Sequence, residues 1–553
     1  MDDGASSFLK GPGMPTEAHP EIQTLLQELV AVRSDTGTTQ ELAMADKLLS
    51  VLRGDPYFLR HPDRCGAFEQ GDALHRPVVW GLRPGRTPRT VVLLGHYDTV
   101  EIECYGALKP YATDPAALKV RMRQQEIHDP GLLRDLEDDA WGFGRGMADM
   151  KAGLAINLHT LLTRKEGEAG VLFLAVPDEE RMSSGAIQAV PLLLGLRERF
   201  GLDYRLLVLT EPETTNGEDL GVVRVTGGGT GKILPVVLAK GVLTHAAHIL
   251  DGLNSAFMLA EIVRSVELDT GLVSGDKGQV VQPPATQIMR DLKSGYDVSV
   301  PEYSAACFNL MFFPTRSPLS LLEDLRRICA GAVRRVLRRY HRAFDAMVGM
   351  GALAEGGRQR FVPEVLTLGE LEQRLGGAPD FAAFRQATLD RLQDEVRSGR
   401  CALPDASIQY LKAMAERAAF PGPAVVLGIS PPYYPAVSNL AIGKDVAPFL
   451  EGLDEHLRTR YASRLEYLPY RPSITDLSYT SCPDPAAERR LLDNVALAPA
   501  LYDVPVEQIA QLNLPVLALG PNGREIHRAG EHVYLPDVTG RIPDLVAAII
   551  DRV

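Results

Sequence analysis

Three short apolar runs in the first half of the chain restrict its fold more strongly than any other feature. They are VVLLG at 91–95, GVLFLAVP at 170–177 and LLVLT at 206–210, and polar residues follow each of them. Runs of this kind suit strands that are buried on both faces of a sheet. Helix-length segments separate them, so the order strand, helix, strand predicts an α/β fold with a mainly parallel sheet.

The pattern changes after the glycine-rich segment TGGGTG at 226–231. An alternating segment, a helix, the strand-like AACFNLMFFPTR and a long helix then indicate a small α+β unit. The apolar runs PAVVLGIS and LPVLALG and a last helix resume the first style. We therefore expect a discontinuous α/β domain with an inserted α+β domain. The predicted parts are residues 1–228, the insertion at 229–368, and 369–553, which begins with extra helices.

Composition narrows the functional classes. The chain has 58 Lys and Arg against 71 Asp and Glu, a net charge of −13, which argues against nucleic acid or anionic membranes as partners. No apolar run approaches the roughly 20 residues of a membrane span, and the N-terminus does not resemble a signal peptide. Six widely spaced cysteines form no Cys-x-x-Cys pair, which is typical of reduced thiols. We expect a soluble, cytoplasmic protein.

Residues able to bind metal follow each of the three runs. His96 and Asp98 follow the first run, Asp178-Glu179-Glu180 the second, and Glu211 and Glu213 the third. A His-x-Asp pair is by itself more often structural, and the acidic triplet could be a solvated turn. Carboxyl ends of parallel strands meet at one edge of a sheet, however, and ligands bind there.

Two further residues belong to the same pattern. Asp149 lies in the glycine-rich loop WGFGRGMADMKAG, where it could bridge two cations or cap the next helix. His527 follows the late apolar run 514–520. Imidazole and carboxylate ligands without thiolate suit Zn²⁺, Co²⁺ or Mn²⁺, so the sequence predicts a metal site that activates water.

The segment GGGTGK at 227–232 is similar to a phosphate-binding loop but does not fit it. That loop needs a glycine five positions before the Gly-Lys pair and Ser or Thr after it, whereas Thr226 and Ile233 stand there. A glycine hinge between domains is the better interpretation. A nucleotide-dependent ligase is accordingly disfavoured.

Five motifs together resemble a known family. GHYDTV, GRGMADMKAG, DEERMSSGA, TEPE and GPNGREIH occur in the order seen in the two-metal peptidase and amidohydrolase family of acetylornithine deacetylase, succinyl-diaminopimelate desuccinylase and glutamate carboxypeptidase. The length, GKILP, PPYYP and SITDLSY most resemble its RocB-like, arginine-utilisation branch.

The resemblance implies a role for each matching residue. His96, Asp149 and Glu211 would hold one metal ion, and Asp149, Glu180 and His527 the other. Both ions would be divalent, with Zn²⁺ the first expectation and Co²⁺ or Mn²⁺ alternatives. Asp98 would orient His96, and Glu179 would be the general base. Glu213 is a weaker ligand candidate than Glu211, which directly precedes the proline as in the family.

The inserted domain of the family acts as a lid, mediates dimerisation and supplies a histidine that stabilises the oxyanion. His245 aligns best with that histidine, although it could be an ordinary interdomain residue, and Asn254 in the matching stretch is a candidate substrate contact. The family's Asp-x-Arg pair is absent. Asn309 and Met311 stand in its place, so Asn309 becomes a second candidate substrate contact.

The predicted function is hydrolysis of a C–N amide bond by water that two metal ions activate. Candidate substrates are an N-acyl amino acid, a peptide or an arginine-related derivative, and a homodimer through the inserted domain is expected. An aminopeptidase or dipeptidase remains an alternative. A non-catalytic metal-binding or regulatory protein on the same fold remains another.

Overall fold

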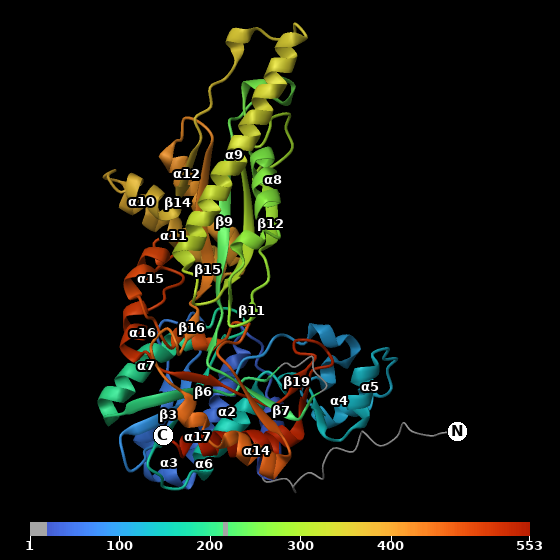
Figure 1. Cartoon of the computed structure of the whole chain (residues 1–553), viewed down its shortest axis with the longest axis vertical. Helices are drawn as coiled ribbons and strands as arrows, with labels where there is room; N and C mark the ends of the chain where they lie inside the picture. The colour runs from blue at the N-terminus through green and yellow to red at the C-terminus, as the bar shows by residue number, and fades with distance from the viewer. Residues whose placement is uncertain (1–18, 214–218) are drawn as a thin grey trace.

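A computed structural model describes residues 19–213 and 219–553 of the 553-residue chain. Residues 1–18 and 214–218 of the predicted 1–228 segment thus lie outside the described residues. Figure 1 shows a lower body built around one large sheet and an elongated upper unit that rises from it. Among the described helices, none has the length and apolarity needed to cross a membrane.

The lower body contains an eight-stranded sheet in the order β1-β2-β5-β3-β6-β18-β7-β17. Pairing is parallel from β5 through β18 and between β7 and β17, and antiparallel at β1–β2, β2–β5 and β18–β7. The strands are Cys65–Phe68, Val78–Arg83, Gly170–Val176, Arg89–His96, Asp203–Leu209, Val516–Ala518, Val222–Thr226 and Arg464–Leu468, in that order. The predicted fold class, a discontinuous and mainly parallel α/β domain with an inserted α+β domain, is confirmed.

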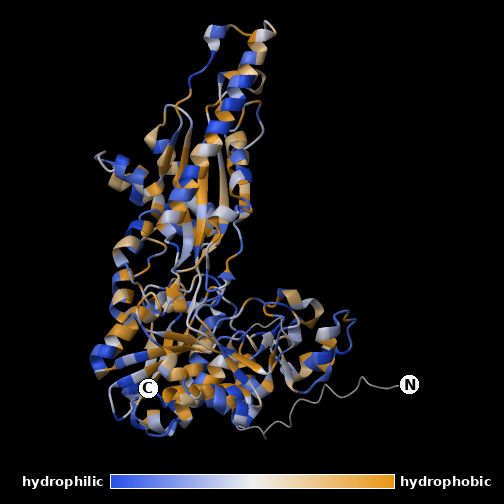
Figure 2. Cartoon of the chain, in the orientation of Figure 1, coloured by the Kyte–Doolittle hydropathy of each residue, from blue (hydrophilic) through white to orange (hydrophobic). Residues whose placement is uncertain are grey.

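Helices cover both faces of this sheet, which explains why its strands read as continuous apolar runs. Along β3, Val91 and Leu93 pack toward one group of helices, and Val92 and Leu94 toward another. The first group is α1 (Pro20–Val30), α2 (Gln40–Gly54), α6 (Lys151–Thr163) and α17 (Ile542–Ile550); the second is α7 (Ser184–Phe200) and α16 (Val506–Leu512). Figure 2 shows the resulting apolar interior of the lower body.

The upper unit contains a five-stranded sheet in the order β12-β13-β9-β15-β14. Only β14 and β15 pair in parallel. The strands are Ala285–Asp291, Tyr303–Phe312, Gly231–Lys240, Ala424–Tyr434 and Glu364–Thr367. One face packs on α8 (Ser255–Val266) and α9 (Pro318–Gly349), and the other on α10 (Leu368–Leu375), α11 (Phe381–Arg397) and α12 (Leu403–Ala418).

The expectation that the run PAVVLGIS returns the chain to the main sheet is wrong. That run forms β15, which pairs with β9 and β14 in the upper sheet. A strand covered on both faces has the same apolar pattern in either sheet, so the pattern could not tell the two apart. After β15, β16 (Val437–Ser438) pairs with β8 (Gly228–Gly229) in a separate two-stranded sheet, and the chain re-enters the main sheet only at β17, which pairs with β7. The boundaries 1–228, 229–368 and 369–553 remain predictions.

The remaining elements lie around these two sheets. A small sheet joins β19 (Gly523–Arg524), β20 (His532–Tyr534) and β4 (Trp141–Phe143), and β10 (Gly275–Asp276) pairs with β11 (Gln279–Val280). The short helices are α3 (Pro56–Arg60), α4 (Pro115–Met122), α5 (Pro130–Glu137), α13 (Ala447–Leu450), α14 (Leu453–Tyr461) and α15 (Pro485–Leu492). All six cysteines are free thiols, and Cys65, Cys307, Cys329 and Cys482 are buried.

Candidate metal centre

Four adjacent parallel strands deliver the predicted metal ligands to one edge of the main sheet. In the order β5-β3-β6-β18, they lead to Glu180, His96, Glu211 and His527. The loop before α6 adds Asp149. We call these five residues the ligand group. The arrangement follows from topology, because the carboxyl ends of neighbouring parallel strands lie side by side.

Asp149 lies between the two histidines of the ligand group. Its Oδ1 is 3.1 Å from His96 Nε2, and its Oδ2 is 3.3 Å from His527 Nε2. Glu180 Oε1 lies 2.9 Å from the same His527 nitrogen. The donor atoms of His96, Asp149 and Glu180 lie within 4.8 Å of one another. One carboxylate thus offers a separate oxygen to each side of the group.

The centre carries an excess of buried negative charge. Burial, together with neighbouring carboxylates, raises the pKa of Glu180 and Glu211 and raises that of Glu179 well above its usual value. Against the effect of burial, Asp149 and Asp98 raise the pKa of His96. Glu211 Oε2 is buried and has no hydrogen-bond partner among the described residues. Such a site favours bound cations, and the nitrogen and oxygen donors suit divalent metal ions.

Asp98 contacts both His96 and the acidic turn. Its backbone carbonyl lies 3.0 Å from His96 Nδ1, and its carboxylate Oδ1 lies 3.5 Å from that nitrogen. The two carboxylate oxygens accept the backbone N–H groups of Glu179 and Glu180, at 3.1 and 3.2 Å. Asp98 therefore fixes the backbone at Glu179 and Glu180. Its contact with Nδ1 of His96 also determines which nitrogen of that ring carries the proton.

A buried ion network holds the turn that carries Glu179 and Glu180. Arg76 Nη1 lies 2.7 Å from Asp178 Oδ1 and 2.8 Å from Glu41 Oε1, while its Nη2 lies 2.7 Å from Asp72. Glu41 Oε2 also accepts the N–H of Asp178 at 3.1 Å. These charges are paired and hydrogen-bonded, as buried charges must be. Neither Arg76 nor Glu41 was predicted, because both lie outside the motifs.

A second buried pair fixes the loop of Asp149. Glu531 Oε1 accepts the backbone N–H groups of Ala148 and Asp149, each at 3.2 Å, and its other oxygen binds Arg145. Strand β20 pairs with β4, so the segments before Asp149 and after His527 belong to one small sheet. This pairing holds the loop that carries Asp149 next to the segment that carries His527.

Three other predicted site residues lie outside this constellation. His245 is exposed, and its Nδ1 accepts the N–H of Ala247 at 3.1 Å. Asn254 caps α8 by accepting the N–H of Ala256 at 2.9 Å. Asn309 is half-buried on β13, opposite Ala285 of β12. Among the described residues, no hydrogen bond, ion pair or ring contact joins any of the three to the ligand group.

Two charged residues near the centre were not predicted. Asp476 is 1% exposed, and its charge raises the pKa of both Glu179 and Glu211. Lys232 lies between Met311 and Tyr434 across three strands, and its Nζ is 5.5 Å from the Tyr434 ring centroid. Both lie in stretches singled out by resemblance, SITDLSY and GKILP. Nothing local in those stretches indicates that Asp476 becomes buried or that Lys232 becomes half-buried beside Tyr434.

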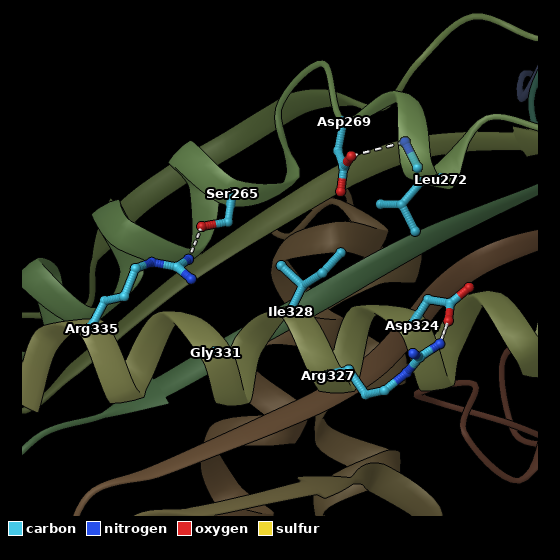
Figure 3. Close-up of a pocket in the computed structure, with 9 residues that line it drawn as sticks. Ser265, Asp269, Leu272, Asp324, Arg327, Ile328, Gly331 and Arg335 are labelled. Atoms are coloured by element: carbon cyan, nitrogen blue, oxygen red, sulfur yellow. Dashed lines mark hydrogen bonds and ion pairs between the residues drawn. The ribbon is translucent and has the colours of Figure 1, made fainter.

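A separate depression lies on the upper unit between α8 and α9 (Figure 3). It has a volume of about 620 Å³ and is lined by Ser265, Asp269, Asp324, Arg327, Ile328 and Arg335, among others. Figure 3 shows Arg335 directed at Ser265 and Arg327 at Asp324. It shares no residue with the ligand group.

Comparison with known proteins agrees with the motifs. Residues 92–325 match the family described as Peptidase family M20/M25/M40. Uncharacterized protein YqjN of Bacillus subtilis is 30% identical over 562 residues, covering 97% of each chain. Protein RocB of the same bacterium is 25% identical over 545 residues, covering 95% of this chain and 93% of its own.

One solved structure supports the fold. The M20 family metallo-carboxypeptidase Sso-CP2 from Sulfolobus solfataricus has a TM-score of 0.51 with this chain. It is 11% identical, and the superposition covers 96% of this chain and 99% of the other. The predicted resemblance to the two-metal peptidase family and to RocB is confirmed.

Proposed function

Because the chain belongs to peptidase family M20/M25/M40 and is a metal-dependent hydrolase of amide bonds, we propose that its ligand group binds two divalent metal ions. His96, Asp149 and Glu211 would hold one ion, and Asp149, Glu180 and His527 the other. The observation that carries this proposal is the division of the Asp149 oxygens between His96 and His527. The unpartnered Glu211 oxygen is consistent with a ligand role.

Zn²⁺ is the metal we expect first, with Co²⁺ or Mn²⁺ as alternatives. Bound metal would polarise the scissile carbonyl and make water a stronger acid. Glu179 follows the end of β5 next to Glu180, and its raised pKa suits a group that takes up a proton. It would accept the proton of the attacking water and return it to the leaving nitrogen. Asp98 would hold Glu179 in place through the backbone.

His245 is proposed to stabilise the oxyanion formed on the substrate. It is exposed on the upper unit, which leaves it free to approach the centre of the same chain or of a partner chain. A homodimer through the upper unit is part of the proposal. Strand β12 is the edge of the five-stranded sheet among the described residues, and its exposed edge suits pairing with a second copy.

The substrate is a small molecule or peptide with an amide bond. We propose an N-acyl amino acid, a peptide or an arginine-related derivative, turned over in the cytoplasm. Asn309 remains a proposed contact, whereas the capping bond of Asn254 gives that residue a structural role as well. An aminopeptidase or dipeptidase is the alternative, and a requirement for a free α-amino group would identify it.

The deciding experiment combines metal analysis with turnover. Purified protein should hold close to two transition-metal ions and hydrolyse a member of a panel of N-acyl amino acids, dipeptides, and arginine or citrulline derivatives. Glu179→Gln should retain the ions and lose about 10²- to 10⁴-fold in rate, the usual contribution of a positioned acid–base group. Full activity in metal-free protein would exclude the mechanism. No turnover at any metal loading would favour a non-catalytic role.

A further inference from the structure

Asp476 lies where the chain passes between the two units. It begins the 3-10 helix Asp476–Tyr479, in the segment that follows β17. This segment is fastened to the strand crossing at 228–230, since Thr230 Oγ1 donates to Ser473 O at 3.0 Å and Arg471 N to Gly228 O at 2.8 Å. The crossing links β7 of the main sheet to β9 of the upper sheet. Asp476 therefore lies in the interior of the protein, where the two units join, and not on an outer surface.

The carboxylate of Asp476 is buried without a cationic partner. The residue is 1% exposed, neither Oδ1 nor Oδ2 has an ion pair or a close hydrogen bond among the described residues, and the neutral hydroxyl of Ser183 is the one side-chain donor that acts on it. Asp537 is equally buried but is satisfied, because Asn522 and Arg541 donate to its two oxygens at 2.5 to 2.9 Å. Burial of a carboxylate without a compensating charge is strongly unfavourable. Because Asp476 has no cation beside it, its burial points to a ligand that supplies one.

Asp476 shares its surroundings with the general base and one ligand candidate. Its charge raises the pKa of Glu179 and of Glu211, and the charge of His96 acts in turn on Asp476. Burial raises the pKa of Asp476 to about 7, with the Ser183 hydroxyl opposing this shift. Ser183 Oγ is also buried without a hydrogen-bond partner. The two side chains form a polar recess beside the centre.

The cations of this region leave Asp476 unpaired. Arg471 Nη2 donates to Pro212 O at 2.6 Å. Lys232 has its ammonium over the Tyr434 ring, and no ion pair joins it to Asp476 among the described residues. At the lid strand β13, Asn309 and Met311 provide no charge. The group that neutralises Asp476 is therefore expected to come from outside the chain.

We propose that Asp476 determines specificity by pairing with a cationic group of the substrate, an ammonium or a guanidinium, next to the scissile amide. This inference rests on the proposed function and names the class of substrate. A charged hydrogen bond to a buried carboxylate discriminates strongly against a neutral isostere, because the neutral molecule leaves the carboxylate unpaired. The carboxylate would then be neutralised only while substrate is bound.

Matched substrates test the charge directly. Arginine and citrulline derivatives of the same amide differ by a guanidinium and a neutral ureido group, and peptides with free and acetylated α-amino groups form a second pair. The wild type should prefer one cationic member by at least about 10-fold in kcat/KM. Asp476→Asn should abolish that preference through KM, leave the neutral member within about threefold, and retain the metal ions.

Two controls separate specificity from structure. Glu488→Gln alters a carboxylate on α15 that binds the Tyr433 hydroxyl, and this variant should keep the preference. Asp476→Glu keeps the charge and should keep part of the preference. Asp476→Asn should unfold at the same temperature as the wild type or higher, because it removes an unpaired buried charge. A large loss of stability, or loss of metal in this variant, would make Asp476 structural or a ligand instead.

A binding measurement separates failure of this inference from failure of the proposed function. Arginine amide and citrulline amide are titrated into metal-loaded wild type and Asp476→Asn by calorimetry. The wild type should bind the arginine compound about 10-fold more tightly and the variant should bind both equally. Equal binding by the wild type would overturn the role of Asp476. Selective binding without turnover of any amide would overturn the hydrolase mechanism alone.

Discussion

His527 Nε2 lies 2.9 Å from Glu180 Oε1, although the two residues are 347 positions apart in the chain. The same nitrogen is 3.3 Å from Asp149 Oδ2. Each of the three comes from a different connection at the edge of the main sheet. The contact therefore depends on the order of strands in that sheet. A substitution at His527 should remove one of the two proposed metal ions and leave the other in place.

His527→Ala should lower the bound metal from about two ions to about one and reduce hydrolysis at least 100-fold, because a metal ion that activates water would lose a ligand. Elemental analysis after dialysis measures the first effect. The side chain of His527 is 48% exposed, so the variant should fold normally. Arg528→Ala, at the exposed neighbour, is the control and should keep both ions. Two ions retained in His527→Ala would contradict the assignment.

Asp98→Asn should weaken both metal affinity and turnover. The amide can accept only one of the two N–H groups of Glu179 and Glu180, and its NH₂ would face the other donor. Metal affinity should fall about 10- to 100-fold, as for other residues that support ligands. Competition with a chelator gives the affinity, and kcat measured at saturating metal gives the effect on Glu179. Unchanged values for both would mean that the backbone carbonyl of Asp98 suffices to hold His96.

Glu261 on α8 should stabilise the upper unit in a pH-dependent way. Hydrogen bonds from Arg264 and Arg335 lower its pKa to about 2, and its side chain is 17% exposed. A carboxyl group whose pKa is lowered in the folded protein stabilises the fold fully at pH values above its unfolded pKa, near 4.5. This stabilisation is lost as the pH falls toward the folded pKa of about 2. Glu261→Gln should therefore unfold earlier than the wild type at pH 7, by about 1 kcal/mol at this partly solvated site.

The difference between wild type and Glu261→Gln should shrink when unfolding is measured at pH 5, 4 and 3. Arg335, which Glu261 binds from the neighbouring helix, is seen at the edge of the depression in Figure 3. Glu323→Gln is a suitable control, since Glu323 pairs with Arg326 on the same helix and its side chain is 47% exposed. Its effect should be smaller. A gap that stays constant with pH would show that the charge of Glu261 is unimportant.

Met289→Lys should disrupt the proposed dimer. Met289 lies on β12, the edge strand, and is 48% exposed. A lysine on an exposed edge opposes pairing with a second copy. Light scattering after gel filtration should give a dimer for the wild type and a monomer for the variant. Leu59→Lys, at an exposed apolar residue of α3 in the lower body, should remain dimeric. A monomeric wild type would exclude this mode of assembly.

The sequence was most informative where the physical signal is local. The runs at β3, β5 and β6 were recognised because a strand covered on both faces is continuously apolar. The positions of Glu180, Glu211 and His527 followed, since parallel strands end at one edge. The part that each residue plays at the metal site could be assigned only from the family motifs. Spacing alone was also compatible with a solvated turn at the acidic triplet and a helix cap at Asp149.

Other features depend on contacts that no local pattern encodes. The run that forms β15 is apolar in the same way as the main strands, and only its pairing with β9 assigns it to the upper sheet. Arg76 and Glu531 each bind a motif residue from a distant segment. Asp476 is an ordinary loop residue by sequence, and its unpaired carboxylate exists only because the tertiary structure closes around it.

Strand β18 lies between β6 and β7 in the main sheet, yet it is made almost at the end of the chain. During synthesis β6 must keep an open edge while the whole upper unit emerges and becomes able to fold. Such long-range pairing is slow to form and leaves a strand edge exposed to association. Hydrogen exchange during refolding should show the amides of β9 and β13 protected before those of β6. We therefore expect the edge of the lower body that carries the ligand group to form last, after the upper unit that the lower body encloses in sequence.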